Sequence, residues 1–229
     1  MKYLILSLSL AFITLNAASQ EDKNFDRSRV SVGVGSVSPL GDLVSDSNGF
    51  AGGGISFNID YAIAASNNMA IVFGFNRGMI QLDEEAINTV KEGGINNSFG
   101  VDGSSGKYKM TSFIIGAEAR TSGKHYFYVN PYFGLGKLTT PEITYQTFEI
   151  FNSTYTTVSN KVTSRSEIST IYGLKLGAHF LLSDHFGIGL FGRYEQGNFR
   201  FPGETIVFKS SSNITYEALT TGVNLHFSF

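Results

Sequence analysis

The sequence predicts an all-β fold, in which eight antiparallel strands close into a barrel that crosses a membrane. Three observations predict it: apolar and polar residues alternate in eight separate runs, short and long connections alternate between the runs, and charges avoid the apolar face. Alternation is typical of strands, because successive side chains point to opposite faces.

The lengths of the connections indicate how the chain crosses the membrane. Three short turns, AASNN, TSGKH and LLSDH, join the second run to the third, the fourth to the fifth and the sixth to the seventh. A membrane barrel with both ends on one side has short turns there and longer loops opposite. The longer segments are 38–53, 77–107, 137–167 and 196–212.

The composition is that of a folded, apolar chain without cysteine chemistry. Charged residues make up 16% and aromatic residues 14%, which excludes disordered and collagen-like chains. The formal net charge of −2 gives no basic field for nucleic acid. The sequence holds no cysteine, so it offers neither a disulfide framework nor a thiolate metal site. We therefore expect no cofactor, no metal and no nucleic-acid partner.

The first residues have the form of a secretory signal. Lys2 precedes an apolar stretch from Tyr3 to Leu15, which is too short to cross a bilayer as a helix, and small residues follow it. We therefore expect a signal peptide over residues 1–19 and a barrel domain over residues 20–229. No later stretch reaches 18 consecutive apolar residues, so we expect no transmembrane helix in the mature protein.

The first four runs place branched or aromatic residues on one face and small or polar residues on the other. In the fourth run, Ile114 breaks the alternation, and Lys109 would face outward unless a bulge intervened. The apolar positions are Val30, Val32 and Val34; Ile55, Phe57, Ile59 and Tyr61; Met69, Ile71, Phe73 and Phe75; and Phe113, Ile115, Ala117 and Ala119.

The last four runs follow the same pattern. Pro131 lies inside the fifth run and removes one ladder donor. The eighth run, TTGVNLHFSF, must pair with the first strand, because a closed barrel leaves no free edge. The apolar positions are Phe127, Val129, Phe133 and Leu135; Tyr172, Leu174, Leu176, Ala178 and Phe180; Phe186, Ile188, Leu190 and Tyr194; and Thr221, Val223, Leu225, Phe227 and Phe229.

The distribution of polar residues favours a membrane barrel over a soluble one. The polar face is mostly Gly, Ser and Asn, which coat a soluble protein poorly but suit the narrow interior of an eight-stranded barrel. A charge on the lipid face would cost about 2–4 kcal/mol at the bilayer midplane. The register instead places a lumen charge network inside, in which three acids and three bases can neutralise one another: Asp60, Glu118, Arg120, Lys175, Arg193 and Glu195.

The chain resembles the small OmpA/OmpX-like outer-membrane β-barrels of Gram-negative bacteria, over essentially its whole mature length. The resemblance rests on VNPYFGLG (129–136), on VGVGSVSPLGD (32–42) and on four C-terminal residues, Gly222, Leu225, Phe227 and Phe229. It implies a place in the bacterial outer membrane with periplasmic termini and contact with outer-membrane lipid. It also implies that the four C-terminal residues form the signal read by the barrel-assembly machinery. Tyr and Phe must form the aromatic girdle, because the chain has no Trp.

The function that we favour is structural or surface-interacting, with paired charges plugging the lumen. The loops 77–107 and 137–167 would then bind an extracellular protein or another surface partner. From LDEEAINTVKE in the first loop we expect a short helix, with Ile87 and Val90 on one face. We expect the second loop to form a hairpin beyond the membrane, whose edge is a place for a partner to add a strand.

Two alternatives stay open. The first is a narrow passive channel for small solutes, gated by the lumen charges. The second is a lipid-modifying outer-membrane enzyme that uses His226 and Ser228 as base and nucleophile. The register points this pair into the lumen, whereas acyl chains lie outside, so we predict no catalytic residues and no enzymatic activity.

Overall fold

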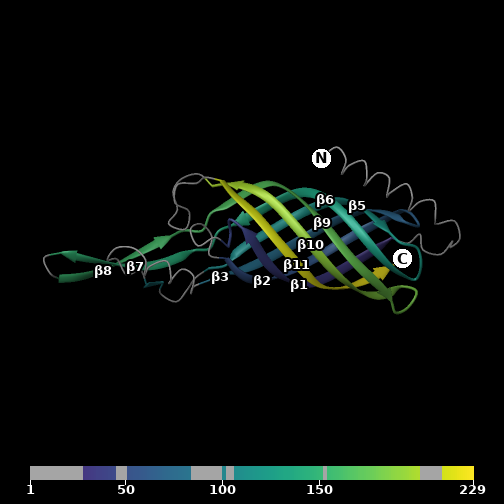
Figure 1. Cartoon of the computed structure of the whole chain (residues 1–229), viewed down its shortest axis with the longest axis horizontal. Coiled ribbons are helices and arrows are strands. Elements are labelled where there is room, and N and C mark those ends of the chain that lie inside the picture. Colours follow the sequence, from purple (N-terminus) through teal and green to yellow (C-terminus); the bar gives the residue numbers. More distant parts are fainter. Residues whose placement is uncertain (1–27, 45–50, 84–99, 102–105, 152–153, 202–212) are drawn as a thin grey trace.

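The computed structural model describes residues 28–44, 51–83, 100–101, 106–151, 154–201 and 213–229. Eight of its strands form a closed antiparallel barrel in the order β1-β11-β10-β9-β6-β5-β3-β2, and a separate sheet has the order β4-β7-β8 (Figure 1). The barrel strands are β1 (Arg29–Gly41), β2 (Ala51–Ser66), β3 (Met69–Leu82), β5 (Tyr108–Arg120), β6 (His125–Thr139), β9 (Ser166–Leu181), β10 (Phe186–Arg200) and β11 (Asn213–Ser228). The sheet strands are β4 (Gly100–Val101), β7 (Ile143–Phe151) and β8 (Thr154–Val162). No helix in the described part of the chain is long and apolar enough to span a membrane.

The first and last strands close the barrel. β1 pairs antiparallel with β11 along its whole length, from Arg29 opposite Ser228 to Gly41 opposite Tyr216. The amide of Phe229 donates to the carbonyl of Ser28 at 3.0 Å and extends the seam to the last residue. The predicted pairing of the eighth run with the first is therefore confirmed.

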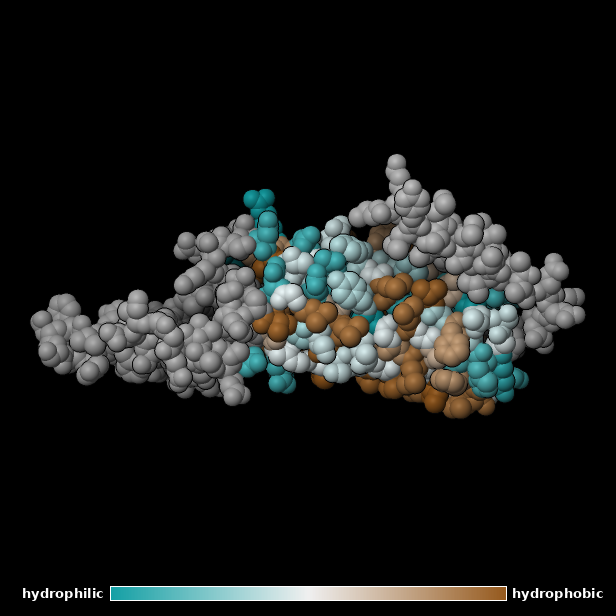
Figure 2. All heavy atoms as spheres, in the orientation of Figure 1, coloured by the Kyte–Doolittle hydropathy of each residue, from teal (hydrophilic) through white to brown (hydrophobic). Residues whose placement is uncertain are grey.

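The predicted apolar face is the outer face of the barrel. Phe127 and Phe133 are 69% and 67% exposed, while Tyr128 and Tyr132 between them are buried. Figure 2 shows hydrophobic residues gathered over the part of the wall nearer the C-terminus, with paler and hydrophilic residues toward the end that carries the long connections. The described short turns lie at the C-terminal end of the barrel, as the alternation of short and long connections predicts.

The strands run farther toward the loop end than the sequence predicts. Residues 77–82 belong to β3, and residues 137–139 and 166–167 belong to β6 and β9. The strands were underestimated because the outward side chains there become polar, so the apolar alternation stops while the ladder continues. The helix expected around Ile87 and Val90 lies outside the described residues.

The predicted hairpin of the second long loop is present. β7 and β8 pair antiparallel, from Ile143 opposite Val162 to Phe151 opposite Thr154. β4 pairs with β7 only at Gly100 and Val101. This small sheet extends beyond the barrel at the loop end (Figure 1).

Ile114, which breaks the alternation of the fourth run, lies inside the barrel. Space for it comes from Gly74 on the neighbouring strand, where a Cβ atom would lie 2.7 Å from Ile114 Cγ1 and 2.7 Å from Asp60 Oδ1. β5 pairs with β3 without a register shift, so no bulge occurs and Lys109 faces outward.

Close packing inside the barrel predicts that Gly177→Ala is destabilising. A Cβ atom at Gly177 would lie 2.5 Å from the Tyr128 ring and 2.5 Å from the backbone oxygen of Leu190, so we expect a loss of about 1–3 kcal/mol in the free energy of unfolding. Gly192 has open space at this position, and Gly192→Ala should change the free energy by less than about 0.5 kcal/mol. Urea unfolding of both variants in lipid vesicles, followed by circular dichroism, measures the difference. Equal effects would contradict the packing.

Candidate functional site: the barrel lumen

All six residues of the predicted lumen charge network are buried inside the barrel, each 5% exposed or less. Two ion pairs cross the interior. Lys175 Nζ on β9 donates to Asp60 Oδ2 on β2 at 2.5 Å, and the guanidinium of Arg29 on β1 donates to both carboxylate oxygens of Glu118 on β5. β2 and β9 are separated by three strands in either direction around the barrel, so their pair spans the full lumen.

A third crossing contact joins β10 to β3, which also lie on opposite walls. Arg193 donates to the side-chain oxygen of Asn76. Glu195, two residues farther along β10, accepts from the Tyr132 hydroxyl at 3.3 Å and from the Ser112 hydroxyl at 3.4 Å. The polar layer is thus held by β10, β3, β5 and β6 as well as by the two ion pairs.

Arg120, a member of the predicted lumen charge network, contacts the backbone of a short turn. Arg120 ends β5 and turns to the β2–β3 turn, where its Nε donates to the carbonyl of Asn67 at 2.9 Å and its Nη2 to the carbonyl of Ser66 at 3.5 Å. Carbonyls in a tight turn lack ladder partners, so they accept from this side chain instead. The partner of Glu118 is Arg29, which the sequence reasoning missed.

A signal for Arg29 was present in the sequence. Ser31, Gly33 and Gly35 occupy the inward face of the first run, and Arg29 is two residues before Ser31, in the same phase. The run was started at Val30 because apolar residues begin there. Extending the two-residue period by one step would have placed the guanidinium inside the barrel.

Aromatic rings and histidines fill the lumen at the short-turn end. The Arg29 guanidinium lies 5.9 Å from the ring centre of Tyr126 and 5.8 Å from that of Tyr128. The Tyr126 hydroxyl contacts His179 Nδ1 at 2.6 Å. The rings of His179 and His226 stack with their centres 4.2 Å apart. These rings therefore pack against one another in the lumen near the short turns.

His226 and Ser228, the hypothetical catalytic pair, both face inward. His226 is 1% exposed, and neither of its ring nitrogens has a hydrogen-bond partner among the described residues, so the Ser228 hydroxyl is not bonded to it. Ser228 instead accepts at its backbone oxygen from His185 Nδ1 at 2.9 Å. The arrangement lacks the hydrogen-bonded base that a serine nucleophile needs.

Buried apolar side chains line the loop-end half of the lumen, and the sequence did not predict this cluster. Several of them, including Ile80, Leu82 and Leu138, come from the strand extensions at the loop end. Each is 8% exposed or less, and the cluster forms one continuous core. Its members are Val37, Leu43, Ala51, Ile80, Leu82, Tyr108, Met110, Ile114, Tyr132, Leu138, Ile171, Phe199, Phe201, Ile214, Tyr216 and Ala218.

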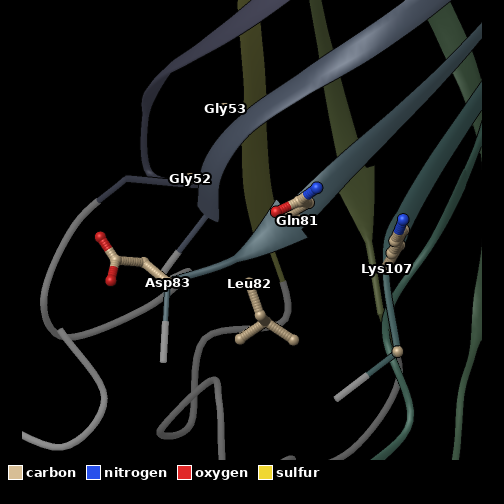
Figure 3. A pocket seen from close by; sticks show the side chains of 7 residues that line it. Gly52, Gly53, Gln81, Leu82, Asp83 and Lys107 are labelled. Atoms are coloured by element: carbon tan, nitrogen blue, oxygen red, sulfur yellow. The ribbon is translucent and has the colours of Figure 1, made fainter. Parts of the chain in front are cut away.

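A separate open hollow lies at the loop-end rim (Figure 3). Gln81 and Asp83 from the end of β3 and Lys107 from the approach to β5 line it, together with glycines of β2. Asp83 and Lys107 stand on opposite sides of it rather than converging. Within the described ranges, no three His, Asp or Glu side chains are grouped so that they could hold a metal ion.

A comparison with protein families gives a match over nearly the whole chain. Residues 5–227 match the family described as the outer membrane protein beta-barrel domain. The chain belongs to this family. It is therefore a protein of the bacterial outer membrane, and the exposed apolar band of its barrel is the surface that contacts lipid.

Solved structures of other outer-membrane barrels share the fold. The chain is similar to Neisserial surface protein A (NspA), with a TM-score of 0.51 and 11% identity, covering 88% of this chain and 97% of that one. It is also similar to Ail, the attachment invasion locus protein of Yersinia pestis, with a TM-score of 0.46 and 15% identity, covering 88% and 99%. OprG from Pseudomonas aeruginosa gives a TM-score of 0.41 and 9% identity, covering 90% and 97%. A comparison with curated protein sequences gives no match.

The buried ion pair predicts a large effect of Glu118→Gln on this outer-membrane barrel. The substitution leaves the Arg29 guanidinium buried without its counter-charge, so we expect a loss of about 3–5 kcal/mol in the free energy of unfolding. The double variant Arg29→Met/Glu118→Gln removes both charges and should recover most of this loss. Urea unfolding in lipid vesicles measures both variants. A single variant within about 1 kcal/mol of the unmodified protein would contradict the pairing.

Proposed function

We propose that this outer-membrane barrel is closed to solutes and acts through the surface that it presents at its loop end. The observation that carries the proposal is the filling of the lumen by two successive layers. The layer toward the short turns is polar and held by crossing ion pairs, and the layer toward the loops is apolar. A structural or surface-interacting role fits such a barrel better than transport.

The contacts that cross the lumen argue against the channel alternative, because they lie in the path of a solute. A solute would have to separate Lys175 from Asp60 or Arg29 from Glu118, and each separation leaves a buried charge without its partner. Breaking a buried pair costs about 3–5 kcal/mol. An ion would then meet the apolar layer, where it would lose its hydration without compensation. The two barriers lie in series.

The projecting sheet supports an interaction role. β7 and β8 carry the chain beyond the barrel, and among the described strands β8 pairs with β7 alone (Figure 1). A strand with one unpaired edge offers backbone donors and acceptors to an extended partner segment. We propose this edge of residues 154–162 as the contact for an extracellular protein or surface partner.

A closed lumen predicts that the protein carries no measurable ionic current across a planar bilayer. The full chain, refolded in detergent and inserted at a density confirmed by labelling, should give no reproducible current steps, with a known porin as the positive control. The Lys175→Ala variant should also give no current steps, because the apolar layer remains. Steps in the unmodified protein that change with Lys175→Ala or Arg193→Ala would make the passive channel the correct function.

The projecting hairpin predicts a loss of binding on its removal. Residues 143–162 are replaced by a short Gly-Ser turn, and cells that display either form are applied to arrays of extracellular-matrix proteins and sulfated glycans. We expect at least one signal of the full chain to disappear, while heat-modifiable migration shows that the barrel still folds. The control Lys124→Gln changes an exposed residue in a short turn and leaves the hairpin intact, so it should bind normally. Identical array profiles for the full and shortened chains would contradict the proposal.

A further inference from the structure

Three basic residues form a triangle on the outer wall of the barrel. They are Arg77 on β3, Lys109 on β5 and Lys137 on β6, and all three are exposed. Arg77 and Lys137 lie on either side of Thr111, since the register pairs Arg77 with Thr111 and Thr111 with Lys137. Lys109 is two residues from Thr111 along β5 and shares its outward face. We name these three residues the basic triangle.

The spacing allows the basic triangle to act on one group. Neighbouring strands lie about 4.8 Å apart, so the Arg77 and Lys137 backbones are about 10 Å apart across β5. Lys109 is the diagonal neighbour of both, because it pairs with Met79 on β3 and Thr139 on β6. Diagonal neighbours on one face lie about 7–8 Å apart. Long flexible side chains at these distances can converge on a single anion above the Thr111 hydroxyl.

The basic triangle begins where the lipid-facing band ends. One step nearer the membrane, the same three strands place Phe75, Phe113 and Leu135 in register. Phe113 and Leu135 are 64% and 57% exposed, and the Phe75 and Phe113 rings lie 5.1 Å apart. The outer wall therefore changes from apolar to cationic over one two-residue step of each strand, about 7 Å. Lipid headgroups occupy this level of a membrane barrel.

Among the described residues, no acidic side chain pairs with the basic triangle. None of the three residues makes a hydrogen bond or ion pair within the part of the chain that the structure describes. Two carboxylates of the loop-end surface have other partners: Glu217 accepts from Gln196 at 3.0 Å, and Glu142 pairs with Lys161 at 2.8 Å. Three adjacent cations at a membrane boundary repel one another unless an external anion lies between them.

We propose that Arg77, Lys109 and Lys137, together with Thr111, bind the phosphate of an anionic outer-leaflet lipid of the phosphorylated glycolipid class. The loop end faces outward because the short turns of such barrels are periplasmic, so the basic triangle meets the outer leaflet. Arg77 supplies a planar donor fork that matches a phosphate, and the lysines add point charges. The phenylalanines below contact the acyl chains of the same lipid. This site is separate from the projecting sheet and from the lumen.

The test titrates bis-phosphorylated lipid A into phosphatidylcholine nanodiscs that hold the full chain, with native mass spectrometry as the readout. The variant Arg77→Gln/Lys109→Gln/Lys137→Gln removes the basic triangle. Since each basic residue near a membrane surface contributes about fivefold to anionic-lipid binding, the triple variant should bind about 100-fold more weakly. The control Lys124→Gln/Lys161→Gln/Arg200→Gln removes the same charge from scattered exposed positions and should bind like the unmodified protein.

Further arms identify the ligand. Dephosphorylated lipid A should bind the unmodified protein no better than it binds the triple variant, and millimolar inorganic phosphate should not displace the lipid. Equal binding by the unmodified and triple-variant proteins, or an equal loss in the scattered control, would overturn the proposal. Effective competition by free phosphate, or by a soluble sulfated glycan, would overturn the assignment to a lipid. Arg77→Gln alone, with a predicted fivefold loss, tests the site if the triple variant fails the heat-modifiability check.

Discussion

The pairing of β1 with β11 is the constraint on which the rest of the structure depends. A membrane interior offers no water to unpaired backbone groups, so the sheet must close on itself. Closure determines which face of every strand is outside. The apolar residues at every second position lie on that face and contact lipid. It also confines the other half of the side chains to a lumen that eight strands make barely wide enough for them. The seam runs to Phe229, whose ring stacks on that of Tyr61 across it.

The contents of the lumen follow from this confinement. Toward the short turns the walls are lined by polar side chains, and the charges among them pair across the barrel, Lys175 with Asp60 and Arg29 with Glu118. Such pairs brace opposite walls, although a buried pair by itself adds little to the net free energy of folding. Toward the loops, the barrel rises above the lipid and its outside becomes polar. Buried apolar residues gather on the inside there, and they form a core like that of a soluble protein.

The sequence predicted those parts of the fold that follow from contact with lipid. The number of strands, the outward face of each strand and the closure of the barrel could be predicted because outward apolar residues such as Ile188 and Val223 alternate with small or polar ones. Above the membrane the polarity of the two faces is reversed: Gln81 faces out and Ile80 faces in. In the sequence, this reversal looks like the end of a strand. The strand extensions and the apolar core were missed for this reason. Ion-pair partners were missed because Arg29 and Glu118 are three strands apart, a relation that no local pattern contains.

Thiol accessibility tests most directly whether the lumen is filled, as we propose, because the chain has no cysteine of its own. Ala218→Cys introduces a small thiol into the apolar layer, and Ser183→Cys introduces one into an exposed turn. Both variants, folded in vesicles, are treated from either side with a small water-soluble methanethiosulfonate. If the lumen is filled, the thiol at position 218 stays unmodified while the thiol at position 183 reacts completely. Rapid modification at position 218 would mean that water fills the barrel, and it would contradict the proposed closed lumen.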